Sequence, residues 1–228
     1  MSPRITLFTF LPSQNAVRAE IVLIEKGLDF ERVEVDLFAG EHRNPPLIDV
    51  NPRGQVPALR WDDGNGTVDL YESIAIVRFL DDMHPEPPLM PPVSEPVARA
   101  AALMRIEEFQ AKLDPRNIFG SVVFGKQSRE QLGTRVDDLL AELPRWDAYL
   151  QGRDYLAGDR FTLADIAVFP LLMHFDLLGY DFAARTPALA AWMERCRKRP
   201  SVVATGWVEG FERFFSRDGM RPARVLAD

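Results

Sequence analysis

The 228-residue chain is poor in the residue types that build disulfides and metal sites. Its one cysteine, Cys196, allows no internal disulfide and no CxxC redox pair, which favours a reducing compartment. Its three histidines, His42, His84 and His174, lack the spacing of metal ligands. We therefore expect a cytoplasmic protein that binds no metal.

Positive charge and long apolar runs are also scarce. The 27 Lys and Arg residues against 34 Asp and Glu residues give a net charge of -7, which disfavours nucleic acids and membrane surfaces as partners. No apolar run approaches the ~20 residues of a membrane span. The N-terminus also lacks the basic and apolar regions of a signal peptide. With 46% hydrophobic and 27% charged residues, the composition is that of an ordinary globular protein.

Strand and helix patterns alternate over residues 1–84. In chain order they predict a strand at 5–10, a helix at 15–26, a strand at 30–37, a short apolar turn at 47–50, strands at 57–61 and 67–70, and a helix at 74–80. The sequence DDGNG between the last two strands is a hairpin signal. We therefore predict an α/β domain over 1–84, in which a βαβ motif is followed by a ββα motif.

A proline-rich linker is predicted at 85–93, where PEPPLMPP can form neither a helix nor a central strand. Beyond it the apolar spacing predicts helices at 94–123, 128–150, 163–178, 187–198 and 201–215. Thr162 and Asp165 form a capping box at the start of one of these helices. We therefore predict a second, all-helical domain over 94–228.

Two junctions of the first domain place polar side chains at a helix N-terminus. In PSQNAVR, at 12–18, the hydroxyl of Ser13 is either a plain N-cap or a functional group. In LYESIAI, at 70–76, Glu72 and Ser73 are either a dipole-favoured acid and a cap, or part of an anion site.

The segment NPRGQVPAL, at 51–59, carries a proline directly before a strand. In a cis conformation, Pro57 would turn the chain so that the backbone groups of Val56 point away from the sheet and can pair with an extended peptide. The alternative, a loop that simply enters an edge strand, stays open at this point.

The motifs PSxxxxR, NPxGQVPAL, LYESxAI and FTLADIA, in this order and spacing, resemble the cytosolic glutathione transferase family over essentially the whole chain. The spacing from Ser13 through Arg18 to Gly27 is similar to the phi and zeta classes, and the loop GEHR at 40–43 is similar to the phi class. The pattern of Ser13, Asn15 and Arg18 is also similar to bacterial and fungal transferases of the nu type. The subclass stays open.

The resemblance implies the glutathione transferase fold, in which a thioredoxin-like α/β N-terminal domain binds glutathione and an all-α C-terminal domain completes the second-substrate pocket. It implies that Val56, held by cis-Pro57, pairs with the cysteinyl part of glutathione, and that Gln55 adds a side-chain contact. Glu72 would hold the amine of the γ-glutamyl end, and Ser73 its carboxylate.

The resemblance also implies roles for residues at the other end of the peptide and at the sulfur. His42 and Arg43 would face the glycyl carboxylate. Ser13 falls at the position of the catalytic serine, whose hydroxyl donates to the glutathione thiolate. Asn15 either assists the sulfur or only fills the first helical turn, whereas Arg18 is interpreted as an anchor of the first helix. A serine at position 13 excludes mixed-disulfide chemistry there.

The resemblance implies a detoxifying glutathione transferase that forms a homodimer, and the apolar character of the candidate pocket residues favours a hydrophobic electrophile as its second substrate. Candidates for its pocket are Leu11, Met104, Glu108, Phe109, Phe119, Phe124, Phe211, Phe214 and Phe215, although a Phe or Met stripe at helical spacing is also typical of a core. Two alternatives stay open: a glutathione-dependent lyase, dehalogenase, isomerase or peroxidase on the same fold, and a non-catalytic glutathione-binding regulatory protein.

Overall fold

The computed structural model describes residues 3–227, which fall into two compact units. The N-terminal unit comprises the residues up to 88 together with 200–211, and the helical unit comprises 89–199 together with the residues from 212 onward. The sequence assigned 200–211 to the helical domain, so the units differ from the predicted domains in this segment. The boundaries predicted at the linker, 85–93, stay a prediction.

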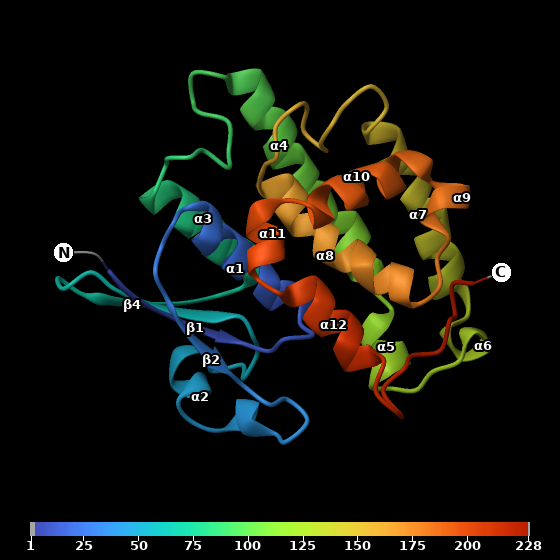
Figure 1. Cartoon of the computed structure of the whole chain (residues 1–228), viewed down its shortest axis with the longest axis horizontal. Coiled ribbons are helices and arrows are strands. Elements are labelled where there is room, and N and C mark those ends of the chain that lie inside the picture. Colours follow the sequence, from blue (N-terminus) through green and yellow to red (C-terminus); the bar gives the residue numbers. More distant parts are fainter. Residues whose placement is uncertain (1–2, 228) are drawn as a thin grey trace. The chain divides into compact units, whose positions relative to one another are not determined.

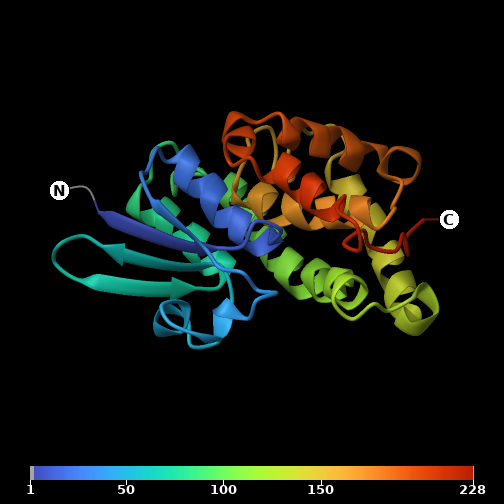
Figure 2. The same ribbon diagram turned by 60° about the horizontal axis from the view of Figure 1, so that its bottom comes forward.

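The N-terminal unit is built on a four-stranded sheet with the strand order β2-β1-β3-β4 (Figures 1 and 2). Strands β1 and β2 are parallel, whereas β1 and β3, and β3 and β4, are antiparallel. Its elements are β1 (Arg4–Thr9), α1 (Gln14–Glu25), β2 (Glu31–Glu34), η1 (Glu41–Arg43), α2 (Leu47–Val50), β3 (Ala58–Asp62), β4 (Thr67–Tyr71), α3 (Ser73–Met83) and α11 (Pro200–Ala204). The predicted order of motifs is confirmed, although the apolar turn at 47–50 is a helical turn and β2 is shorter than predicted.

The strand register brings several loops to one end of this sheet. Phe8 of β1 lies opposite Ala58 of β3, and Ala58 lies opposite Tyr71 of β4. Thr9 of β1 lies opposite Glu34, the last residue of β2. Four loops therefore meet at this end of the sheet: those that follow β1, β2 and β4, and the one that precedes β3.

Helices α1 and α3 are pinned to each other at two points. Arg18 donates from Nη1 to Ser73 Oγ at 3.1 Å, and Lys26 Nζ pairs with Asp81 Oδ1 at 2.5 Å. The second contact lies eight residues after the first on both helices (18 to 26 and 73 to 81), so the two helices run parallel and in register over roughly 12 Å. The second pair is buried, and its ammonium group also donates to Pro87 O at 2.6 Å.

Helix α11 lies against α1, which explains why residues 200–211 group with the N-terminal unit. The Ser201 hydroxyl donates to a carboxylate oxygen of Glu25, the last residue of α1. Val202 is buried in the same segment. The helical periodicity that continues into 201–215 could not reveal this long-range contact, because it depends on a partner 176 residues away.

The helical unit contains the expected helices, several of them shorter than predicted. Its elements are α4 (Pro96–Glu108), a π-helical turn (Phe109–Leu113), a 3-10 turn (Asp114–Arg116), α5 (Phe119–Val123), α6 (Arg129–Leu132), α7 (Thr134–Tyr149), α8 (Leu163–Leu177), α9 (Phe182–Arg185) and α10 (Pro187–Arg197). The predicted helix at 94–123 breaks near Pro115, which has no N–H to donate. The one at 128–150 breaks at Gly133, where φ is 54°, and the one at 201–215 breaks at Gly206, before α12 (Trp207–Phe215).

The predicted capping box at the start of α8 is confirmed. Thr162 Oγ1 accepts from Ala164 N, and Asp165 Oδ2 accepts from Thr162 N at 2.8 Å. Asp165 is fully buried, which raises the pKa of its carboxyl, and its Oδ1 accepts from Trp192 Nε1 at 2.8 Å. Cys196 is also fully buried, and burial raises the pKa of its thiol well above the usual range, as expected of a structural thiol.

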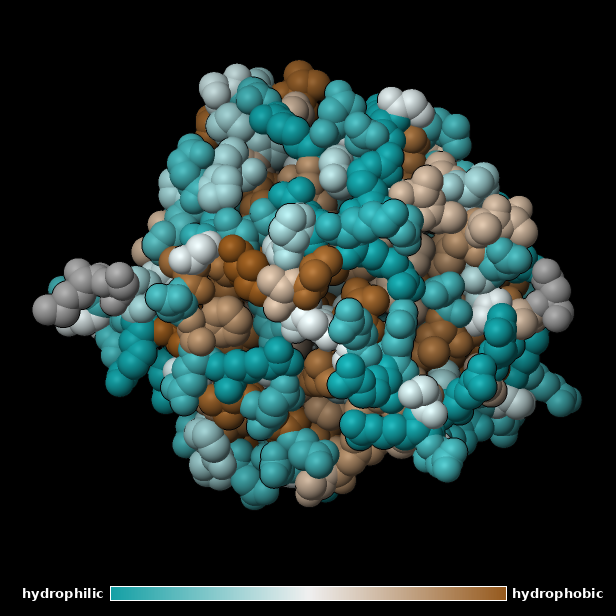
Figure 3. Space-filling model, in the orientation of Figure 1, coloured by the Kyte–Doolittle hydropathy of each residue, from teal (hydrophilic) through white to brown (hydrophobic). Residues whose placement is uncertain are grey.

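The face drawn in Figure 3 is mainly hydrophilic, with hydrophobic residues in separate groups. Over residues 3–227, no helix has both the length and the apolar character needed to cross a membrane. Within the same range, no three His, Cys, Asp or Glu side chains are grouped so that they could hold a metal ion.

Glu20 of α1 is a buried carboxyl that makes the stability of the fold depend on pH. Burial raises its pKa from 4.5 to about 7, against the opposing effect of Arg32. The folded chain therefore keeps this proton to a higher pH than the unfolded chain. The stability that the group contributes is full below about pH 4.5 and is lost as the pH rises through about 7.

We expect Glu20→Gln to remove this pH dependence. Between pH 4.5 and pH 8, the free energy of unfolding of the native chain should fall by roughly 3 kcal/mol relative to that of the variant. Urea denaturation at a series of pH values measures the difference. Glu31→Gln, at an exposed position of β2, is the control and should follow the native profile. Parallel profiles for Glu20→Gln and the native chain would contradict the assignment.

Candidate active site

Ser13 caps helix α1 at the end of the sheet where the loops gather. Its backbone is extended (φ -76°, ψ 115°), and its Oγ accepts a hydrogen bond from Ala16 N at 3.2 Å. Its own N–H donates to Phe10 O at 2.8 Å and closes a tight turn after β1. A serine hydroxyl has one proton and two lone pairs, and the cap uses only a lone pair. The proton of the half-buried Ser13 hydroxyl is therefore available to an acceptor at this helix terminus.

The buried guanidinium of Arg18 joins the start of α1 to the start of α3. Its Nη1 donates to Asn15 Oδ1 at 2.5 Å and to Ser73 Oγ at 3.1 Å. Because arginine can only donate, Asn15 turns its oxygen to Arg18 and its NH₂ group the other way. Over residues 3–227 that NH₂ group meets no hydrogen-bond acceptor. Arg18 Nη1 thus orients two groups, the NH₂ group of Asn15 and the hydroxyl of Ser73.

Glu72 stands before α3 in a strained backbone conformation. Its φ of 68° is in the left-handed region, which costs a residue other than glycine about 1–3 kcal/mol. Its carbonyl accepts from Ile76 N at 3.0 Å, so it closes the first turn of α3, while its side chain is exposed. Strain of this kind is typical of ligand sites, and the first N–H groups of a helix lack intrahelical partners and favour an anion.

The loop before β3 leaves a pair of backbone groups unpaired. The Val56–Pro57 peptide bond is cis, as the first of the two alternatives for this segment requires. Buried Asn51 holds the loop, because its Nδ2 donates to Gln55 O at 2.8 Å and its Oδ1 accepts from Arg53 N at 3.1 Å. In the part of the chain that the structure describes, neither the N–H nor the C=O of Val56 pairs with another backbone group. These groups can pair with an extended ligand.

The short helix η1 meets the same loop through a glycine. A Cβ on Gly54 would lie 2.5 Å from His42 O, and Gly54 has a φ of 60°, so a side chain at this position would clash and strain the backbone. This approach places the half-buried His42 beside the loop 51–57. The Nδ1 atom of His42 is buried without a hydrogen-bond partner among residues 3–227, while Arg43 is exposed.

The residues predicted for the electrophile pocket differ widely in exposure. Phe109, Phe119, Phe211 and Phe215 are at most 5% exposed, whereas Met104 and Phe124 are 54% and 56% exposed. Within the helical unit, the Phe119 ring lies edge-on to Phe215, with centroids 5.4 Å apart. The assignment of these side chains to a pocket stays a prediction.

Several of these aromatic rings pack as core residues do. Phe119 stacks on His174 with ring centroids 3.8 Å apart, and His174 is buried, as expected of a core histidine. Phe211 stacks on Trp207 at 5.0 Å, and the half-buried Phe214 lies edge-on to Phe215 at 5.0 Å.

Glu108 is engaged within the helical unit. Its Oε1 accepts from the Tyr149 hydroxyl at 2.6 Å, and its Oε2 pairs with Arg105 Nη1 at 2.5 Å. The Arg105 guanidinium also lies over the Tyr149 ring, 3.6 Å from its centroid. The Glu108 carboxylate therefore already has a hydrogen-bond donor on each oxygen.

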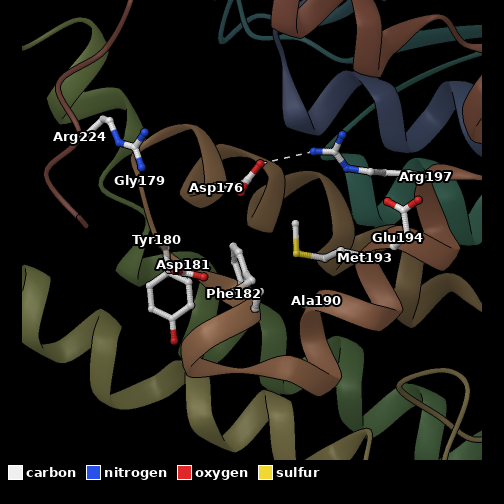
Figure 4. Close-up of a pocket in the computed structure, with 11 residues that line it drawn as sticks. Asp176, Gly179, Tyr180, Asp181, Phe182, Ala190, Met193, Glu194, Arg197 and Arg224 are labelled. Carbon is white, nitrogen blue, oxygen red and sulfur yellow. Dashed lines mark hydrogen bonds and ion pairs between the residues drawn. The ribbon is translucent and has the colours of Figure 1, made fainter. Parts of the chain in front are cut away.

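A cavity of about 400 Å³ in the helical unit contains none of the predicted site residues (Figure 4). It is lined by Asp176, Gly179, Tyr180, Asp181, Phe182, Ala183, Ala190, Met193, Glu194, Arg197 and Arg224. Asp176 pairs with Arg197 at 3.4 Å, and Glu194 pairs with Lys198 at 2.9 Å. Because most of its charges are already paired, the cavity is a weaker candidate than the end of the sheet.

The end of the sheet can hold a peptide and stabilise an anion. It combines the Ser13 hydroxyl, the unpaired backbone groups of Val56 and the N-termini of two helices. Sequence reasoning missed the parts that Asn51 and Gly54 play, although both stand inside the motif NPRGQVPAL. The close approach of Gly54 to His42 O depends on a residue outside that motif, whereas the hydrogen bonds of Asn51 stay within the motif and become visible only in the folded loop.

Two family models match the chain. The model described as glutathione S-transferase, N-terminal domain, matches residues 12–83, and that described as glutathione S-transferase, C-terminal domain, matches residues 100–200. The chain is 35% identical over 207 residues to glutathione S-transferase 3 of Zea mays, a match that covers 85% of this chain and 89% of that protein. It is 31% identical to a glutathione S-transferase of Hyoscyamus muticus, with 83% and 91% covered.

Solved structures agree on the fold. Glutathione transferase F7 from Populus trichocarpa has a TM-score of 0.78 and 29% identity, and the match covers 91% of this chain and 99% of that one. A glutathione transferase homologue from Sulfitobacter, solved with bound glutathione, has a TM-score of 0.76 at 23% identity, which speaks for the fold alone. The predicted thioredoxin-like domain followed by a helical domain is confirmed. The chain belongs to the cytosolic glutathione S-transferase family.

Proposed function

We propose that the chain is a glutathione S-transferase that stabilises the thiolate of bound glutathione for attack on a hydrophobic electrophile. The observation that carries the proposal is the Ser13 hydroxyl, which caps α1 through a lone pair and keeps its proton for the sulfur. Membership of the family supports the activity. Ser13 is a hydrogen-bond donor in this reaction, and the nucleophile is the glutathione sulfur.

The energy that this role requires is small. A free cysteine thiol has a pKa near ~8.5, and lowering it by about two units takes roughly 2.7 kcal/mol. A hydrogen bond to a charged group contributes about 1.5–3 kcal/mol, and a helix N-terminus adds about 0.3–1 kcal/mol. Ser13 at the start of α1 can therefore supply most of the shift, and the outward NH₂ group of Asn15 is suited to supply part of the rest.

The γ-glutamyl end of glutathione would bind at the start of α3, and its cysteinyl part at Val56. Arg18 donates to Ser73 Oγ, so the Ser73 hydroxyl keeps its own proton for the γ-glutamyl carboxylate. Glu72, exposed beside it, would take the amine. The unpaired N–H and C=O of Val56 would hold the peptide in an extended form.

The glycyl carboxylate would face η1. The buried Nδ1 of His42, without a partner among the described residues, suits a carboxylate or a water beside it. Arg43 would add a planar, two-pronged donor, and the exposed Gln55 would add a side-chain contact to the peptide.

The remaining parts of the proposal are the electrophile site, the assembly and the location. The electrophile would contact the residues predicted above, among which Met104 and Phe124 are the most exposed. Val97, 83% exposed on α4, is an apolar residue that a second copy of the chain would cover in a homodimer. A cytoplasmic location suits the single buried cysteine. The non-catalytic alternative is disfavoured, because it would not need the Ser13 donor.

We expect Ser13→Ala to abolish most of the thiolate. In the native protein, ultraviolet titration should show the glutathione thiolate at neutral pH, and in the variant the thiol pKa should return toward ~8.5, with kcat/KM reduced about 10- to 100-fold. Asn15→Ala should give a smaller shift in the same direction. Ser128→Ala removes an N-cap of the same kind from α6 and is the control that should leave the thiol pKa unchanged. A native protein without a thiolate signal would overturn the proposal.

We expect Arg18→Met to act on stability and on glutathione affinity together. It leaves Ser73 Oγ and Asn15 Oδ1 without their shared donor in a buried setting, which should cost about 2–4 kcal/mol of unfolding free energy. Arg4→Met is the matched control, because Arg4 forms an exposed ion pair with Asp62 worth at most about 1 kcal/mol. Urea denaturation and the KM for glutathione measure both effects. Equal losses in the two variants would contradict the role of Arg18.

A further inference from the structure

The turn that carries Ser13 has an anchor that no motif reveals. Phe10 O and Ser13 N close a four-residue turn at 2.8 Å, and Leu11 and Pro12 are its central residues. The N–H of the second residue of such a turn points away from it and takes no part in its closing bond. Here the Leu11 N–H donates to Glu34 Oε2 at 3.2 Å. The turn is thereby fastened to the end of β2.

The Glu34 carboxylate is itself held in place. Its other oxygen, Oε1, accepts a hydrogen bond from Arg32 Nε at 2.9 Å and lies 2.7 Å from Arg32 Nη2 in an ion pair. Arg32 Nε also lies 3.2 Å from Oε1 of the buried Glu20 on α1. Glu34 thus divides its two oxygens between the Arg32 cation and the turn, and the same cation lies beside Glu20 on the helix that Ser13 caps.

The end of the Leu11 side chain packs closely against the main chain at Gly210. A Cβ on Gly210 would lie 2.9 Å from Leu11 Cδ1 and 3.0 Å from Leu11 Cδ2. Gly210 belongs to the N-terminal unit, within the segment 200–211. A glycine in the interior of a helix costs up to about 1 kcal/mol relative to alanine, so its presence here is explained by the room that it leaves for Leu11.

We propose that Glu34 and Gly210 are positioning residues of the active site, which clamp Leu11 and so fix the direction in which Ser13 presents its hydroxyl. The proposal rests on the function proposed above. Because Leu11 is two residues before Ser13 in a closed turn, a tilt of the turn changes the place of the hydroxyl relative to the sulfur. Neither Glu34 nor Gly210 touches the reacting atoms in this role.

The test compares four variants with the native protein. Glu34→Ala removes the acceptor for Leu11 N–H, Glu34→Gln keeps an oxygen acceptor without the charge, and Gly210→Ala pushes on the Leu11 side chain. Glu31→Ala changes an exposed glutamate of the same strand and is the control. The readouts are the pKa of the bound glutathione thiol by ultraviolet absorbance, the separate values of kcat and KM, and hydrogen exchange of the Leu11 amide.

We expect Glu34→Ala to raise the thiol pKa by about half a unit, a roughly threefold change in the acid dissociation constant, and to lower kcat more than it raises KM for glutathione. Leu11 amide exchange should become faster. Gly210→Ala should change the thiol pKa in the same direction, Glu34→Gln should recover most of the loss, and Glu31→Ala should match the native protein.

Three outcomes would overturn the positioning role. A thiol pKa in Glu34→Ala equal to that in Glu31→Ala, with a thiolate present in the native protein, overturns this role and leaves the proposed function standing. Equal impairment of Glu34→Ala and Glu34→Gln shows that the negative charge of Glu34 beside Arg32 matters, and that the acceptor for the Leu11 N–H does not. A native protein without a thiolate overturns the proposed function, and the positioning role with it, whatever the Leu11 amide exchange shows.

Discussion

The candidate site depends first on one buried guanidinium. Arg18 donates from a single nitrogen to Asn15 on its own helix and to Ser73 on another, and so sets the start of α1 against the start of α3. The Lys26–Asp81 pair repeats the connection eight residues along, which prevents the two helices from sliding. Two helix N-termini, each with unpaired N–H groups, are therefore held side by side. A site for a molecule with anionic groups at two places follows from that arrangement.

The sheet supplies the second constraint. Its register ends β1, β2 and β4 at one end of the sheet and starts β3 there, so the unpaired backbone groups of Val56 and the starts of the two helices lie at that end. The backbone departs from ordinary conformations at the same place, with Glu72 at a φ of 68° and Gly54 pressed against His42 O. Such departures persist only where the surrounding structure fixes them, as the Asn51 hydrogen bonds and the first turn of α3 do here.

Local patterns predicted what local interactions determine. Alternating apolar residues placed β1, β3 and β4, the capping box placed the start of α8, and the motif spacing placed Ser13, Val56 and Ser73 at element ends. The breaks at Gly133 and Gly206 were missed because helical periodicity continues across both of them. The contacts of Glu34 with Leu11 and of Ser201 with Glu25 join residues far apart in sequence, and no local pattern encodes such a pairing. Two kinds of feature were therefore missed: local breaks within a periodic pattern, and contacts between residues far apart in the sequence.

In the proposed function, the helix cap and the catalytic donor are the same group, the Ser13 hydroxyl. Because Ala16 N–H approaches one lone pair of Ser13 Oγ, the hydroxyl proton cannot point at that N–H and is directed elsewhere at the helix terminus, where negative charge is favoured. The turn that precedes it is closed by Phe10 and tied to β2 through Leu11, and in the proposed positioning role these contacts fix the place of the oxygen. A donor oriented before the ligand arrives needs little reorganisation when charge develops on the sulfur. In the proposed function, the ordinary chemistry that begins a helix would therefore also prepare this serine to stabilise a thiolate.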